Sequence, residues 1–232
     1  MTKVSILMPV YNEAPTVEEA VQRVLDTDFP FDWELIMVDD GSTDGTSELL
    51  PVLVERSNRI TLLAHERNKG KGTAIRTAVA AAAGEFSTIL DADLEYDPTD
   101  IPALIAPLEE GRSNVAFGVR AFDGYSSHSY LYVLGNRGVT LAANVVFNVY
   151  LKDVITCHKA MRTDLFRALP LQEPGFAVEP EIAARVIQRG ERIFEVPVSY
   201  IARATAEGKK LTALDGFRAL RTLVRCRLSP RA

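Results

Sequence analysis

Apolar and polar positions alternate regularly along the first half of the chain. Short runs that are apolar throughout are separated by longer segments with apolar residues at helical spacing. The predicted strands are 4–10, 33–38, 60–64, 86–90 and 114–118, and the predicted helices between them are 15–26, 46–56, 73–83 and 99–109. Apolar strands that alternate with helices are typical of a parallel sheet covered on both faces, so the pattern predicts an α/β fold.

Prolines and glycines support these boundaries. Pro15 and Pro98 stand where a proline often opens a helix, and Gly84 and Gly111 stand where a glycine often closes one.

After residue 120 the pattern changes. An aromatic-rich helix (128–151), an extended piece (154–162), a helix (179–189), a strand (192–201) and a basic C-terminal helix (211–227) are expected there. We expect residues 1–232 to form one domain.

Composition narrows the choice of function. The chain has 232 residues, of which 47% are hydrophobic, and a formal net charge of −5, which argues against a general nucleic-acid binder. Its two cysteines, Cys157 and Cys226, form no CxxC pair, which indicates a reducing compartment and a cytoplasmic location. The N-terminal apolar run is too short for a signal peptide, and the longest apolar stretch, 139–151, is about half a membrane span. We therefore expect no transmembrane segment.

Polar clusters follow four of the predicted strands. They lie at 11–13, 39–46, 68–72 and 91–95. Parallel α/β sheets bind ligands beyond the carboxyl ends of their strands, so these clusters should meet at one edge of the sheet. Such consistent placement favours a functional site over unrelated surface turns.

The most unusual cluster is the acidic run after the strand at 86–90. Asp91, Asp93, Glu95 and Asp97 alternate along the chain. Carboxylates this close repel one another unless positive charge lies among them, and hard oxygen ligands suit Mg²⁺ or Mn²⁺. We expect a divalent cation held among Asp91, Asp93 and Glu95; a solvated acidic turn is the alternative.

Two loops could bind a nucleotide. In "DDGSTDGT" (39–46), Asp39 can accept hydrogen bonds from the N–H groups of a base, although turn formation alone could explain the loop. "NKGKG" (68–72) offers lysines and flexible backbone to an anionic ligand. The spacing of its glycines does not fit a P-loop, and no GxGxxG follows the first strand.

Cations are frequent in the second half. The set comprises Arg120, Arg137, Lys159, Arg162, Arg203, Lys209 and Lys210. "RATAEGKKL" (203–211) could hold phosphates or could be a solvated basic loop. Opposed acidic and basic clusters suggest a metal together with a multiply phosphorylated ligand.

Several segments together resemble the family 2 glycosyltransferases of the GT-A fold, and in particular the polyprenyl-phosphate hexosyltransferases such as dolichol-phosphate mannose synthases. They are "ILMPVYNE", "MVDDGSTDGT", "ILDADLEYDP", "FGVR" and "VEPEIAARVIQRGERIFEVPVSY", the last followed by "RATAEGKKL". The resemblance implies a mixed, mainly parallel sheet flanked by helices on both faces. It also implies metal-dependent, inverting transfer of a hexose from a nucleotide sugar, of the GDP-mannose or UDP-glucose type, to a polyprenyl phosphate.

The resemblance assigns roles to single residues. Asp93 and Glu95 would bind the metal, and Asp91 would lie near the sugar. Residues 1–120 would form the donor and metal half, and residues 121–232 the acceptor half. The expected donor-binding residues are Pro9, Tyr11, Glu13, Asp39, Asp40, Lys71, Asp91 and Ala92. The expected phosphate-binding residues are Arg120, Arg137, Arg203 and Lys209. The expected catalytic residues are Asp91, Asp93, Arg120 and Arg203.

One departure stands out. The synthases commonly carry Gly-Phe where this chain has Cys157-His158. His158 could contact a phosphate or the sugar, but a packing role is the stronger interpretation. If the acceptor were a hydroxyl group, Asp91 or Glu181 would be candidate bases. Glu179 and Glu181 could equally be a charge pair at a helix N-terminus.

Three alternatives remain open. The protein could use a soluble or glycan hydroxyl acceptor, it could be a nucleotidyltransferase, or it could be a non-catalytic nucleotide-binding module.

The C-terminal helix places Phe217, Leu220, Val224 and Leu228 on one face, with arginines elsewhere. This pattern suits peripheral contact with the cytosolic face of a membrane, or packing against the core.

Overall fold

The fold is known from a computed structural model that describes residues 2–120, 130–202 and 213–229. Within these residues a seven-stranded sheet has the order β3-β2-β1-β4-β6-β5-β7. Its strands are β1 (Lys3–Val10), β2 (Asp32–Asp39), β3 (Ile60–Ala64), β4 (Phe86–Ile89), β5 (Val115–Arg120), β6 (Lys159–Arg162) and β7 (Ile193–Val198). The predicted α/β fold is confirmed.

The sheet is mixed, because β6 runs antiparallel to both of its neighbours. β4 does not pair with β5; the four-residue strand β6 lies between them. β7 then pairs with β5 in parallel. Of the extended segment predicted at 154–162, only Lys159–Arg162 forms a strand. The register places Lys159, the first residue of β6, opposite Phe117, the third residue of β5.

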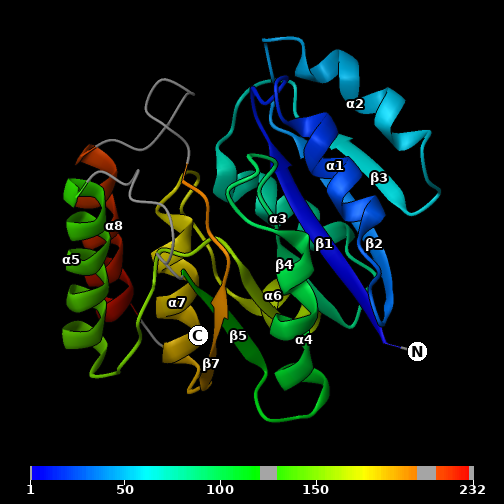
Figure 1. The fold of residues 1–232 in the computed structure, drawn as a ribbon. Coiled ribbons are helices and arrows are strands. Elements are labelled where there is room, and N and C mark those ends of the chain that lie inside the picture. The colour runs from blue at the N-terminus through cyan, green and yellow to red at the C-terminus, as the bar shows by residue number, and fades with distance from the viewer. Residues whose placement is uncertain (1, 121–129, 203–212, 230–232) are drawn as a thin grey trace.

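Helices cover both faces of the sheet (Figure 1). They are α1 (Val17–Asp26), α2 (Thr46–Val54), α3 (Lys71–Ala81), α4 (Ile101–Glu109), α5 (Tyr130–Phe147), α6 (Thr163–Ala168), α7 (Val178–Gln188) and α8 (Ala213–Leu228), with a 3₁₀ turn, η1 (Pro98–Asp100), before α4. The short helix α6 was not predicted. Gly111, just beyond α4, has a positive φ of 66°, which confirms its expected role in ending that helix.

Two apolar cores lie on opposite faces of the sheet. Successive residues of a strand point to opposite faces, so Ile6 and Met8 of β1 belong to the core that includes residues of α1, α2 and α4, whereas Leu7 belongs to the core that includes residues of α3, α5, α6, α7 and α8. None of the described helices is long and apolar enough to cross a membrane. Because β1, β2, β4 and β5 all run in the same direction, their carboxyl ends meet at one edge of the sheet, between the two helical layers.

Candidate active site

A cavity of about 450 Å³ opens at this edge of the sheet. It receives residues from the ends of β1 and β2, from the loop before α3, from the acidic run after β4 and from the end of β5. Residues from the second half of the chain complete the lining. The expected site residues that line it are Pro9, Tyr11, Glu13, Asp40, Lys71, Asp91, Ala92, Asp93, Glu95 and Arg120.

Four expected residues are not part of this lining. Asp39 is buried beside the cavity, and Arg137 is exposed on α5. Arg203 and Lys209 lie outside the described residues, as does Lys210 of the same basic loop. Arg162, from the wider set of cations, is paired with Phe86 at the start of β4 and so lies at the opposite edge of the sheet.

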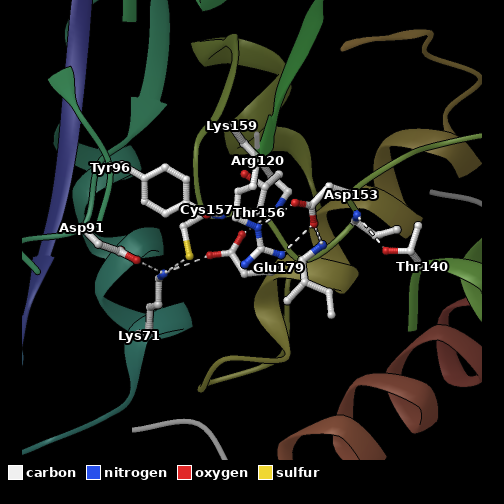
Figure 2. A network of polar contacts seen from close by, with 12 residues as sticks. Lys71, Asp91, Tyr96, Arg120, Thr140, Asp153, Thr156, Cys157, Lys159 and Glu179 are labelled. Atoms are coloured by element: carbon white, nitrogen blue, oxygen red, sulfur yellow. Dashed lines mark hydrogen bonds and ion pairs between the residues drawn. The ribbon is translucent and has the colours of Figure 1, made fainter. Parts of the chain in front are cut away.

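Asp91 is neutralised by a lysine side chain. Lys71, the first residue of α3, places its Nζ 2.7 Å from Asp91 Oδ2 and 3.1 Å from Glu179 Oε1. The same Nζ lies 3.0 Å from Cys157 Sγ (Figure 2). Burial would lower the pKa of Lys71, but the carboxylates of Asp91 and Glu179 outweigh it and raise that pKa well above its usual value. Lys71 is therefore a fixed cation on the cavity wall.

A second lysine, which is buried, holds Glu179 in place. Lys159 on β6 is completely buried, and its Nζ lies 2.6 Å from Glu179 Oε2. The ammonium also donates to the carbonyl oxygen of Thr156. Burial would raise the pKa of Glu179, but Lys159 and Lys71 lower it below its usual value. Charges thus alternate from the buried Lys159 through Glu179 and Lys71 to Asp91 at the cavity (Figure 2).

The burial of Cys157 has a chemical consequence. Burial, together with the negative charge of Asp91, raises the pKa of this thiol well above its usual value, although Lys71 opposes the shift. The side chain therefore stays a neutral thiol at neutral pH, as expected of a cysteine that fills space and not of a nucleophile.

A divalent cation held by Asp93 and Glu95 alone suits this structure better than a cation caged by three carboxylates. Both line the cavity; Asp93 Oδ1 accepts from the Glu95 backbone N–H at 3.0 Å, and Glu95 Oε2 accepts from the Tyr200 hydroxyl at 2.8 Å. Across residues 2–120, 130–202 and 213–229, no three Asp, Glu, His or Cys side chains converge as a metal site would require. Because Asp91 is paired with Lys71, its expected place in the cage is wrong. Mg²⁺ in phosphate-transfer sites uses one or two carboxylates and completes its shell with phosphates and water, which these two residues suit.

Arg120 brings a second positive charge to the cavity. It ends β5, and its Nε and Nη2 lie 2.6 and 2.9 Å from the two carboxylate oxygens of Asp153. Its guanidinium also lies 5.0 Å from the centre of the Tyr200 ring. A bidentate pair and a stacked ring fix the orientation of this arginine, so it is preorganised to face an anion in the cavity.

Asp39 and Asp40 hold the loops that shape the cavity. Asp39 accepts from the Ser42 N–H at 2.9 Å and from the Ser47 hydroxyl. Asp40 accepts from the backbone N–H groups of Lys69 and Gly70 at 2.9 and 2.7 Å. The turn interpretation of 39–46 is therefore confirmed, and Asp40 fixes the path of "NKGKG" along the cavity.

Two further residues have structural roles. His158 is completely buried, its ring packs edge-on against Tyr96 with centroids 5.4 Å apart, and it does not line the cavity, which confirms the packing interpretation. Glu181 accepts from the backbone N–H groups of Gln172 and Glu173 and pairs with Arg225. It is buried in this role away from the cavity, so its candidacy as a base is wrong.

Several residues that line the cavity were not predicted as site residues. They are Val10, Asn68, Gly70, Ala74, Asn136, Cys157, Gly175, Phe176 and Tyr200. Gly70 belongs to "NKGKG", and Cys157 to the pair that departs from the synthases. Phe176 precedes the predicted helix at 179–189, and Tyr200 lies within the predicted strand at 192–201, although β7 ends at Val198. Nothing in their local pattern directs these rings toward a site.

Comparisons with known proteins agree with this arrangement. A family model described as Glycosyl transferase family 2 matches residues 5–169. The chain is 30% identical to glycosyltransferase AglJ of Haloferax volcanii, with 92% of this chain and 68% of that protein aligned. It is 27% identical to a dolichol-phosphate mannosyltransferase of Pyrococcus furiosus (89% and 59%) and 34% identical to a dodecaprenyl-phosphate galacturonate synthase of Rhizobium johnstonii (87% and 60%). The chain thus spans about 60% of the length of the last two proteins.

Solved structures share the fold. Glucosyl-3-phosphoglycerate synthase from Mycobacterium tuberculosis, in complex with UDP, superposes with a TM-score of 0.75 over 99% of this chain and 81% of that one, at 22% identity. The same protein has been crystallised with Mn²⁺, UDP and its glucosylated product, with a TM-score of 0.75 and 21% identity.

Proposed function

The chain belongs to glycosyltransferase family 2, and from this premise we propose that it transfers a hexose from a nucleotide sugar to a polyprenyl phosphate with the help of a divalent metal. The donor would be of the GDP-mannose or UDP-glucose type, and transfer would invert the configuration at the sugar C1. Two relatives whose names specify dolichol phosphate or dodecaprenyl phosphate support this choice of acceptor.

The observation that carries the proposal is the meeting of opposite charges in one cavity. Asp93 and Glu95 line the cavity together with the fixed cations Lys71 and Arg120. A nucleoside diphosphate leaving group gains negative charge as the bond to the sugar breaks. Preorganised cations stabilise that charge where it develops, and each such contact is worth about 3 kcal/mol in the barrier.

Each group has a part in this scheme. Asp93 and Glu95 would hold the metal, which when bound neutralises the diphosphate and makes it a better leaving group. Pro9, Tyr11 and Glu13 would border the nucleotide, with the turn held by Asp39 beside them. Asp91, fixed by Lys71, would face the sugar. Arg120 would face an acceptor phosphate, and we assign the same role to Arg137, Arg203 and Lys209.

A phosphate acceptor suits the chemistry of the cavity. A phosphate oxygen is already ionised at neutral pH, whereas a hydroxyl group needs a base to accept its proton. Of the described residues that line the cavity, none is a histidine, and Asp91 is held in an ion pair with Lys71. We assign donor and metal binding to residues 1–120 and acceptor binding to residues 121–232 of a single domain, which acts at the cytosolic surface of a membrane.

Product partitioning tests the proposal. The chain is incubated with Mn²⁺, labelled GDP-mannose or UDP-glucose, and a short polyprenyl phosphate. The proposal predicts label in the organic extract and release of a nucleoside diphosphate. Release of a nucleoside diphosphate with all of the label kept in the aqueous phase would indicate transfer to a hydroxyl group, and release of pyrophosphate would indicate a nucleotidyltransferase; either result contradicts the proposal.

The chain offers a matched pair of variants. Asp93→Asn removes one carboxylate charge from the cavity and should abolish transfer while the fold is kept. Asp97→Asn removes a charge from the same segment, but Asp97 caps η1 by accepting from the Thr99 N–H and does not line the cavity. Asparagine caps as well as aspartate does, so this control should keep wild-type turnover. Equal activity in the two variants would refute the role of Asp93.

A further inference from the structure

Helices α5 and α8 expose an unusual amount of apolar surface. The two helices pack against each other at one end of the molecule, at the far side of the sheet from α2 (Figure 1). Their inward residues, such as Val139 and Leu223, belong to the core, but their outward residues are also apolar. Those on and just after α5 are Tyr130, Leu134, Leu141, Val145 and Tyr150, and those on α8 are Leu214, Phe217, Leu220, Val224 and Leu228. We call this set the α5–α8 face.

The exposure is too extensive for scattered surface residues. Val145 and Phe217 each keep 73% of their surface accessible, and the spacing of three and four residues places each helix's members along one side. Elsewhere among the described residues the large exposed apolar side chains are Val52 and Ile201. Apolar exposure of this extent, gathered on two neighbouring helices, marks a surface that another molecule covers.

The charges beside the face indicate what covers it. The described parts of α5 and α8 carry five arginines and one aspartate, in a chain whose formal net charge is −5. The aspartate, Asp215, pairs with Arg218, and Arg225 is turned inward to Glu173 and Glu181. Arg137, Arg218, Arg221 and Arg227 are exposed among or beside the apolar residues. Apolar side chains interleaved with arginines match the acyl boundary and the anionic headgroups of a lipid surface.

We propose that the α5–α8 face docks the protein on an anionic membrane. The face would make two kinds of contact with the membrane. The apolar side chains enter the boundary between headgroups and acyl chains, and the long arginine side chains reach the lipid phosphates. A second protein copy fits less well, because two such faces would bring like charges together.

Helix α5 connects the α5–α8 face to the cavity. Asn136 of α5 lines the cavity, and it lies between Leu134 and Arg137, which belong to the exposed side of the same helix. Docking through α5 would therefore hold the cavity beside the lipid surface. The docking proposal stands on the exposed face alone and does not require that the acceptor be a polyprenyl phosphate, so the two proposals can fail separately.

Vesicle flotation of the full chain tests the proposal. Vesicles of phosphatidylcholine are compared with vesicles that also contain phosphatidylglycerol, at low and high salt. The chain should float with the anionic vesicles, and binding should weaken as salt rises. Phe217→Ser/Val145→Ser should lower the partition coefficient roughly tenfold. Arg218→Glu/Arg221→Glu should lower it by at least roughly tenfold, and only for the anionic vesicles.

Val52→Ser is the matched control, because Val52 on α2 is 57% exposed but lies away from the face. It should bind like the wild type, and all variants should keep the wild-type melting temperature. Absence of flotation for the wild type would overturn the proposal, as would equal flotation of all variants. A dimer in light scattering that Phe217→Ser/Val145→Ser dissociates, without vesicle binding, would assign the face to a protein contact and overturn it as well.

Discussion

Replacing His158 by phenylalanine should make the protein less sensitive to acid. His158 is completely buried, and among the described residues neither ring nitrogen has a hydrogen-bond partner. Burial lowers the pKa of His158 from 6.5 to about 3, against a weaker opposing effect of Asp97. The folded protein therefore keeps the imidazole neutral, whereas the unfolded chain protonates it below about pH 6.5.

The sign and size of the effect follow from this difference. A histidine with a depressed folded pKa leaves stability unaffected above the unfolded pKa, and stability falls as pH drops from 6.5 toward 3. Between pH 7 and pH 4.5 the unfolded chain takes up nearly one more proton than the folded protein. The free energy of unfolding should fall by about 2.5 kcal/mol from this residue alone.

Urea unfolding at the two pH values, followed by circular dichroism, measures this loss. With a denaturant slope of about 3 kcal/mol per molar, the midpoint should drop by roughly 0.8 M more in the wild type than in His158→Phe. Phenylalanine preserves the contact with Tyr96 and is the residue common in the related synthases; His158→Leu serves as a second variant. An identical acid-induced loss in wild type and both variants would refute the reasoning, as would an NMR titration of His158 near pH 6.5 in the folded protein.

Two further predictions concern the support of the cavity. Glu179→Gln leaves the buried Lys159 without its carboxylate and should lower the free energy of unfolding by about 3–5 kcal/mol in urea titrations. The double variant Lys159→Met/Glu179→Leu should recover most of that loss. Wild-type stability in Glu179→Gln would count against a buried charge network. Gly70→Ala places a Cβ 2.4 Å from the Pro174 carbonyl oxygen at a φ of +91° and should cost about 3 kcal/mol. Gly111→Ala, with a positive φ but no neighbour within 4 Å, should cost about 1 kcal/mol, and equal losses in calorimetric melting would show that the contact with Pro174 is unimportant.

Much of the site could be predicted because it depends on chain direction. Apolar strands separated by helices imply parallel strands, and parallel strands bring their following loops to one edge. For this reason Tyr11, Asp40 and Asp91 could be placed together from the sequence, whereas the place of Arg120 was an expectation from the family resemblance. The acidic run after β4 also had a predictable chemical meaning, since close carboxylates require positive charge nearby.

The rest depended on contacts between distant segments. The positive charge beside Asp91 comes from Lys71, whose position is set by Glu179 on α7 and Lys159 on β6. No sequence pattern near Asp91 predicts such a partner. The four-residue strand β6 is too short for a clear periodicity, and its antiparallel insertion between β4 and β5 is a tertiary choice. Likewise, the ring of Tyr200 reaches the cavity only because β7 pairs beyond β5.

Titration calorimetry of nucleotide binding tests the central claim most directly. UDP and GDP are titrated into the wild type, Asp93→Asn and Asp97→Asn, each with Mn²⁺ and with EDTA. We expect one nucleotide to bind the wild type and Asp97→Asn at least roughly tenfold more tightly with Mn²⁺, and Asp93→Asn to lose that gain. Binding with the same affinity in EDTA, or a full Mn²⁺ effect in Asp93→Asn, would contradict a metal-assisted donor site at this edge of the sheet.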